Sequence, residues 1–179
     1  MLNPTIDLAE NEKIQKNFSV SNIYILLNLA FHSFIALIIS YFLPNNGDSL
    51  NIFLSKYLNI NISSAMTNNI VDIIYYALFL YVAVVALGLL YLRLSNNYYL
   101  TNKRLIVRYG FLNIDIKTVE YNRITDMETK QNFFERFISF SGDITVNTAG
   151  GDEMEIELYN IDSPTELKAI INTLRDQIG

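Results

Sequence analysis

The sequence predicts an α+β membrane protein, in which a two-helix transmembrane hairpin is followed by a small antiparallel β-barrel or sheet that a C-terminal helix caps. Residues 17–47 and 73–92 contain no Asp, Glu, Lys or Arg, and each run is long enough to cross a bilayer. After Arg93, apolar and polar residues alternate as in β-strands. Residues 164–178 then carry apolar side chains at helical spacing.

The composition limits the chemistry that the chain can perform. Of its 179 residues 51% are apolar and 17% are charged, and it has no cysteine and one histidine. Disulfides, thiolate metal sites and cysteine catalysis are excluded, and a multi-histidine metal site is not expected. We therefore predict no enzyme activity, no catalytic residues, no metal and no cofactor.

The first predicted span covers residues 20–43 and follows an N-terminal tail of residues 1–19. Its 24 residues form a helix of about 36 Å, against a hydrocarbon core of about 30 Å. Because acidic residues precede the span and no small-residue cleavage pattern follows it, we do not expect a removable signal peptide.

The second predicted span covers residues 70–93, after a connector of residues 44–69. Its tyrosines and phenylalanines suit the two water interfaces and the helix packing seam. Asp72 stands near its start, where a carboxylate reaches headgroups or water.

The positions of the cations predict the orientation. Two lysines precede the first span, Lys56 alone lies in the connector, and four cations closely follow the second span. By the positive-inside rule, both termini face the cytoplasm of a multi-pass protein of the cell membrane, and the connector faces out.

The connector contains one amphipathic segment. Leu50, Phe53, Leu54, Tyr57 and Leu58 form an apolar stripe at helical spacing. A helix here either lies along the outer interface or covers the top of the hairpin, and the sequence does not separate the two. Asn61-Ile62-Ser63 is also a glycosylation-type triplet on the predicted outer side.

Residues 95–179 are predicted to form the globular domain. The expected strands occupy residues 97–100, 103–109, 112–121, 123–130, 144–148 and 154–158, with a turn at Thr101-Asn102 and a glycine turn at residues 149–152. The apolar phase of residues 112–118 changes before Val119, which predicts a bulge. Phe133, Phe134, Phe137 and Ile138 fit one short apolar helix.

The last helix has the strongest local signal. Ser163, Pro164 and Glu166 match a capping box with proline at the first helical position. Leu167, Ile170, Ile171, Leu174 and Ile178 then share one side, which we expect to cover the sheet.

These residues resemble a known family. The run from Tyr99 to Gly110 is similar to the strand-turn-strand that opens the bacterial PH-like domain, once catalogued as domain of unknown function 304. The segments Val119 to Met127, Gly142-Asp143-Ile144 and Asp162-Ser163-Pro164 continue the likeness, which departs from the family pattern only at Ser141. It covers roughly residues 95–177 and implies a PH-like fold, often preceded by two spans, with no catalytic set.

Two groups of polar residues could carry a site. Tyr24, Asn28 and His32 share one face of the first span, and we favour hydrogen bonding to the second span over metal binding or proton relay. Acidic residues 152, 153, 155 and 157 could form a cation cluster, but alternation along a strand favours a solvated face.

The function is predicted from these observations and from the resemblance. We expect a cytoplasmic PH-like domain that serves as a module for protein interaction or oligomerisation, as a homo-oligomer or with other membrane protein subunits. The alternative is anionic headgroup binding by Lys103, Arg104 and Arg108, which closely follow the second span. The partners are then the lipid bilayer and proteins; the net charge of −5 disfavours nucleic acid.

Overall fold

A computed structural model describes residues 7–42, 47–60, 62–149 and 155–177 of the chain. The chain divides into two compact units. The first, which we call the β-body, combines Met1–Ile25 with Leu90–Gly179, and the second, the helical unit, is Leu26–Leu89.

Two long helices account for most of the helical unit. They are α1 (Asn22–Phe42) and α3 (Ser64–Ser95), and both are long and apolar enough to cross a membrane. The bounds of both helices differ from those of the predicted spans. Helix α1 begins after Val20 and Ser21. Helix α3 begins six residues before residue 70, because the carbonyl of Ser63 accepts the amide protons of Met66 and Thr67 and so starts the helix among polar residues.

The connector is helical, as its spacing predicts. Helix α2 (Gly47–Phe53) is followed by a π-helical turn, η1 (Leu54–Leu58), which ends at Asn59 in the left-handed region. The rings of Phe53 and Tyr57 contact each other, 5.1 Å apart between centroids, and both side chains are exposed. Asn61 lies outside the described residues, and with it the glycosylation-type triplet.

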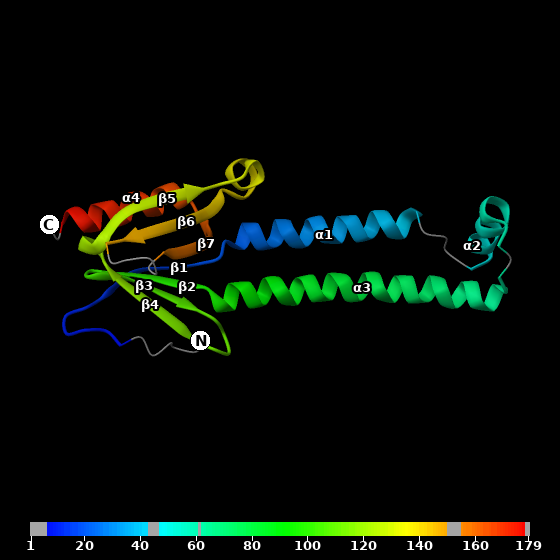
Figure 1. Ribbon diagram of the computed structural model, residues 1–179, viewed down its shortest axis with the longest axis horizontal. Coiled ribbons are helices and arrows are strands. Elements are labelled where there is room, and N and C mark those ends of the chain that lie inside the picture. The colour runs from blue at the N-terminus through cyan, green and yellow to red at the C-terminus, as the bar shows by residue number, and fades with distance from the viewer. Residues whose placement is uncertain (1–6, 43–46, 61, 150–154, 178–179) are drawn as a thin grey trace. The chain divides into compact units, whose positions relative to one another are not determined.

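The strands of the β-body form two antiparallel sheets (Figure 1). The first contains β1 (Ile14–Ser19), β2 (Asn97–Thr101), β3 (Arg104–Tyr109) and β4 (Asp115–Glu120), in that order. The second contains β5 (Ile124–Lys130), β6 (Ser141–Thr148) and β7 (Ile156–Asp162). A single bridge between Val20 and Ile161 joins them. The described strands do not close a barrel, since β4 and β5 do not pair with each other and each is an edge strand.

The N-terminal segment supplies a strand that the sequence analysis did not predict. We expected residues 1–19 to be a tail and the domain to start at residue 95. Instead β1 pairs with β2, and Ser19 lies opposite Asn97. The helices α1 to α3 are therefore an insertion between two neighbouring strands of one sheet.

The core of the β-body lies between the two sheets and α4 (Pro164–Asp176). It includes Tyr98, Leu100 and Leu105 from the first sheet, and Ile144 and Leu158 from the second. The predicted pairing of the last two strands is confirmed, since Ile144 lies opposite Leu158 and Val146 opposite Ile156. Residues 150–154, including the predicted glycine turn and Met154, are outside the described residues.

The predicted bulge in residues 112–121 is wrong. The register of β3 and β4 is regular, and the apolar side chains of Leu112, Ile114 and Ile116 are exposed. The phase changes because Ile114 and Ile116 lie on the exposed face and Val119 lies on the opposite, buried face of a regular strand. Tyr121 then enters the core from a 3-10 turn, η2 (Tyr121–Arg123). Its hydroxyl donates to the carbonyl of Thr101 at 2.8 Å.

The last helix begins at Pro164, as predicted, but without the capping box. Ser163 has φ 49° and makes no side-chain cap, while its carbonyl accepts the amide protons of Glu166 and Leu167. The Glu166 carboxylate lies 3.7 Å from Lys16 of β1. The apolar face is confirmed, because Leu167, Ile171 and Leu174 are buried.

Two leucine-to-alanine substitutions, one in the core and one at the surface, should differ in their effect on the stability of the full-length chain in detergent. Leu158→Ala leaves a cavity and should lower the free energy of unfolding by about 2 to 5 kcal/mol. Leu112→Ala, at a side chain that is 81% exposed, should change it by less than about 0.5 kcal/mol. Denaturant unfolding followed by near-UV circular dichroism of the tyrosines measures both; equal losses would contradict the described core.

Candidate functional site

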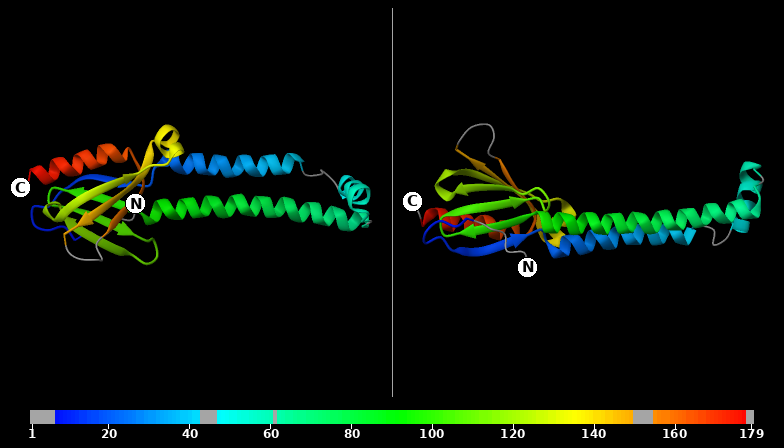
Figure 2. Two further views of the ribbon diagram at one scale, coloured as in Figure 1. Left: turned by 45° about the horizontal axis from the view of Figure 1, so that its top comes forward. Right: turned by 90° about the horizontal axis from the view of Figure 1, so that it is seen from below.

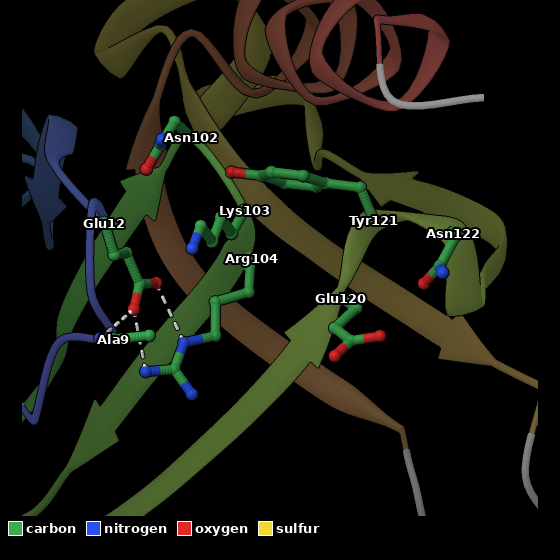
Figure 3. A pocket seen from close by; sticks show the side chains of 8 residues that line it. All are labelled: Ala9, Glu12, Asn102, Lys103, Arg104, Glu120, Tyr121 and Asn122. Atoms are coloured by element: carbon green, nitrogen blue, oxygen red, sulfur yellow. Dashed lines mark hydrogen bonds and ion pairs between the residues drawn. The ribbon is translucent and has the colours of Figure 1, made fainter.

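One pocket of about 270 Å³ lies where the N-terminal segment meets the turn between β2 and β3 (Figure 3). The N-terminal segment, this turn, the end of β4 and η2 line it. The lining residues are Ala9, Glu12, Asn102, Lys103, Arg104, Glu120, Tyr121 and Asn122.

An ion pair with a buried carboxylate and a partly exposed guanidinium stands at one wall of this pocket. The Arg104 guanidinium donates from Nε to Glu12 Oε1 at 2.8 Å and from Nη2 to Oε2 at 2.9 Å. Thr101 Oγ1 and the amide of Ala9 also donate to this carboxylate, each at 2.8 Å. Burial alone raises the pKa of Glu12, but the hydrogen bonds from Arg104, Ala9 and Thr101 and the charge of Arg104 outweigh it and lower the pKa to about 2.

Further hydrogen bonds fix the rest of the N-terminal segment. Lys103 Nζ donates to the carbonyl of Glu10 at 2.8 Å, and Arg104 Nη2 donates to that of Asp7 at 2.8 Å. The amide of Lys13 donates to Asn102 Oδ1 at 2.9 Å. We call the set from Asp7 to Lys13 and from Thr101 to Arg104 the N-terminal clamp. The polar groups of the clamp bind one segment of the chain to another, so we interpret the pocket as a structural contact and not as a reactive centre.

The three cations proposed for headgroup binding do not form one patch. Lys103 and Arg104 belong to the clamp. Arg108 lies four residues further along β3, which is about 13 Å away in an extended strand. Its Nε is buried and has no hydrogen-bond partner among the described residues.

The polar residues of the first span fall into both units. In the β-body, the amide of Tyr24 donates to Ser21 Oγ at 3.2 Å, at the start of α1. In the helical unit, His32 Nδ1 lies 2.5 Å from the hydroxyl of Tyr81 on α3, with the two rings edge to face. Asn28 stands one turn before His32 on α1.

The acidic strand contributes hydrogen bonds to tyrosines. Tyr159 donates its hydroxyl to the Glu157 carboxylate, and this bond together with burial raises the pKa of Tyr159 to about 12. The hydroxyl of Tyr109 donates to the Glu157 carbonyl at 2.6 Å. Among the described residues, no group of three or more His, Asp or Glu side chains is arranged to hold a metal ion; Asp152 and Glu153 are outside the described residues.

The edge strand β4 forms the most open surface of the first sheet. It pairs with β3 alone among the described strands. Five of its six residues, Asp115 to Thr118 and Glu120, are exposed. Ile116 lies opposite Arg108, and Ile114 precedes the strand with its side chain exposed. We call Ile114, Ile116 and Thr118 with the neighbouring Arg108 the β4 edge surface.

Sequence reasoning missed the partner of Arg104. Glu12 precedes Arg104 by 92 residues, and no local pattern links them. The available signal was weak: Ile14, Phe18 and Val20 stand at even spacing just before the first span, as in a strand, but Lys16 interrupts the alternation.

Comparison with known proteins gives a family match over most of the chain. A family model described as "Bacterial PH domain" matches residues 25–175. Among solved structures, a DUF1696 family protein with a pleckstrin-homology domain from Shewanella loihica PV-4 is similar at 18% identity, over 45% of this chain and 68% of that chain, with a TM-score of 0.33. No curated protein matches.

The clamp predicts how stability depends on pH. Because the pKa of Glu12 is lowered from 4.5 to about 2, its carboxylate stabilises the fold fully above about pH 4.5 and loses this effect as the pH falls towards 2. At about 1.4 kcal/mol for each pKa unit, the effect is about 3 kcal/mol. In Glu12→Gln, we expect a lower free energy of unfolding at neutral pH and a weaker loss in acid.

Glu10→Gln is the matched control, since the Glu10 side chain is exposed and only its carbonyl enters the clamp. Unfolding of the full-length chain at a series of pH values compares the three proteins. An acid profile of Glu12→Gln that coincides with that of the unsubstituted chain would show that the ion pair does not stabilise the fold.

Proposed function

The chain belongs to the bacterial PH domain family, and from this premise we propose that it is a non-enzymatic, two-span membrane protein of the cell membrane. In this proposal the β-body is a cytoplasmic module for protein interaction, either in a homo-oligomer or as a subunit of a larger membrane complex. PH-like domains typically act as non-catalytic interaction modules.

The pairing of β1 with β2 supports the proposed membrane topology. Paired strands must lie on the same side of a membrane, and the segment between Ser19 and Asn97 contains both helices that are apolar enough to span one. The chain then crosses the membrane twice and returns to the side on which it began. Of the cations that flank the two apolar helices, two precede the first and four follow the second, against Lys56 alone in the connector, which favours the cytoplasmic side for the β-body.

The single observation that carries the interaction role is the β4 edge surface. Unpaired backbone groups of an edge strand are a template for another strand, and PH-like folds bind peptides in this way or along a helix groove. Here Ile114 and Ile116 are exposed on one face of this edge, and the charged Asp115 and Lys117 alternate with them on the other face. A strand from a second copy or from another subunit would pair with β4 and cover both isoleucines.

Anionic headgroup binding is the second candidate function, and one cation among the three predicted residues supports it. Arg108 keeps a buried Nε without a partner among the described residues. Lys103 and Arg104, by contrast, are occupied in the N-terminal clamp. We therefore favour protein interaction.

The topology can be tested by cysteine labelling, because the natural chain has no cysteine. Tyr57→Cys in η1 should react with a membrane-impermeant maleimide in intact cells. Asn122→Cys, on η2 of the β-body, should react only after permeabilisation. Both variants should stay in the pellet after a carbonate wash. Labelling of Asn122→Cys in intact cells would refute a cytoplasmic β-body.

The β4 edge surface can be tested by one substitution and a matched control. Ile116→Lys should convert the assembled species in detergent to single chains, because a charge replaces an apolar contact. Thr125→Lys, which adds the same charge at an exposed position of β5, should leave the assembly intact. Light scattering of the extracted protein measures both masses. A natural chain that is monomeric and co-purifies with no other subunit would contradict the proposal.

A further inference from the structure

We propose that two apolar loops of the β-body insert into the interfacial zone of the same membrane leaflet that its two helices enter. The first loop is the turn between β3 and β4, with Phe111 and Leu112. The second is the connection between β5 and β6, which contains the π-helical turn η3 (Glu135–Ser139) and carries four phenylalanines, Phe133, Phe134, Phe137 and Phe140. We call these six side chains the apolar rim. This inference rests on the proposed membrane function.

The apolar rim consists of side chains that the core does not use. The four phenylalanines of the second loop are between 59% and 69% exposed, and Leu112 is 81% exposed. The sequence pattern predicts a short apolar helix here, which would ordinarily face a core. An exposed group of large aromatic side chains marks a contact surface for an apolar partner.

Hydrogen bonds within the second loop hold the backbone that carries these side chains. The amide of Asn132 donates to Glu135 Oε2, and the amide of Glu135 donates to Asn132 Oδ1, each at 2.8 Å. Gln131 Nε2 donates to the carbonyl of Ser141 at 2.7 Å. The loop thus satisfies these polar groups internally, which lowers the cost of bringing it into an apolar environment.

Phe140 adds a conformational argument. It has φ 49°, in the left-handed region that residues other than glycine rarely adopt. A large aromatic residue in this conformation, with its side chain exposed, is costly for folding alone. Such strain is commonly retained where the residue has a function.

Both loops lie at the end of the β-body from which the helices depart. Asn97, just after α3, lies opposite Arg108, and the first loop begins two residues later. The amide of Ser163 donates to the carbonyl of Phe140 at 2.8 Å, while Val20, just before α1, bridges to Ile161. Figures 1 and 2 show η3 beside the first turn of α1, which belongs to the β-body.

This position identifies a bilayer as the occupant. The last turn of α3 and the residues just before α1 are tied together, since Arg93 Nη1 donates to the carbonyl of Val20 at 2.9 Å. In the proposed topology these residues mark the membrane surface, so the rim lies at the same level and is continuous with that interface. Phenylalanine and leucine favour this zone, and the cation of Arg136, 5.5 Å from the Phe137 ring, can reach headgroups.

The charges of the two loops indicate that apolar contact, rather than lipid charge, provides the attraction. The first loop is flanked by Arg108 and Asp115, and the second contains Glu135 and Arg136. Because the signs are mixed, neither loop is a basic cluster of the kind that selects anionic lipid. Insertion should therefore be the same in neutral and in anionic vesicles.

Single-cysteine variants of the full-length chain test the inference. Leu112→Cys and Phe137→Cys place an environment-sensitive fluorophore in each loop, and Asn122→Cys places it on η2 as a water-exposed control. Phe34→Cys, on the exposed face of α1, reports membrane integration. Each labelled protein is reconstituted into phosphatidylcholine vesicles, with and without phosphatidylserine. Quenching is measured with brominated phosphatidylcholine and with iodide on both sides of the membrane.

We expect the two rim labels to be quenched by brominated lipid at least threefold more than the Asn122 label, and less by iodide, in both vesicle types. Rim labels that match the Asn122 label overturn the inference. So do labels shielded from iodide but not reached by brominated lipid, which would mean that protein covers the rim. Dependence on phosphatidylserine overturns the apolar mechanism. If the Phe34 label itself escapes brominated lipid, the proposed membrane function fails instead.

Discussion

The pairing of β1 with β2 is the interaction on which the architecture depends. These strands are neighbours in one sheet, yet 77 residues separate Ser19 from the opposite Asn97. Closing such a long loop has an entropic cost that a few strand hydrogen bonds offset only in part. If the intervening helices form first as a hairpin in a membrane, their ends are already close together. The loop that the strands must then close is effectively short, and strand pairing follows from helix pairing.

The N-terminal clamp explains how a short strand at the edge of the sheet keeps its register. The ion pair between the buried Glu12 and the partly exposed Arg104 is not by itself strong evidence of stability, because the carboxylate loses its hydration and the guanidinium loses part of it. Its geometry is nevertheless specific, since the carboxylate accepts four hydrogen bonds, from Arg104, Thr101 and Ala9. A shift of β1 by one residue would leave this charge buried and unpaired. The clamp therefore favours one register over its alternatives, and Lys16 adds a weak contact to Glu166 on α4.

Local patterns predicted much of this fold, and the failures have a common cause. The alternation of Ile144 and Val146 and the face of Leu167 and Ile171 are set by near neighbours, so their prediction succeeded. The role of β1, the partner of Arg104 and the use of Glu166 depend on residues far along the chain. Ser163 shows why a sequence motif can fail. Its amide donates to the carbonyl of Phe140, its φ is 49°, and its side chain does not cap the helix. Pairing information of this kind is absent from a single sequence.

The spacing of apolar residues predicts a helix but does not predict which surface its side chains contact. Helical spacing is shared by Leu167 of the core and by Phe137 of the apolar rim, so spacing alone cannot say which surface receives a side chain. The neighbouring elements of the fold determine whether such a side chain is buried. Leu167 packs in the core on a helix that begins at Pro164. Phe137 stands on a turn closed by Asn132 and Glu135, and its side chain is exposed. An exposed aromatic turn is a liability in water. In the proposed topology, the same turn would lie at the membrane surface, where lipid covers its aromatic side chains and gives the β-body a point of attachment besides the two helices.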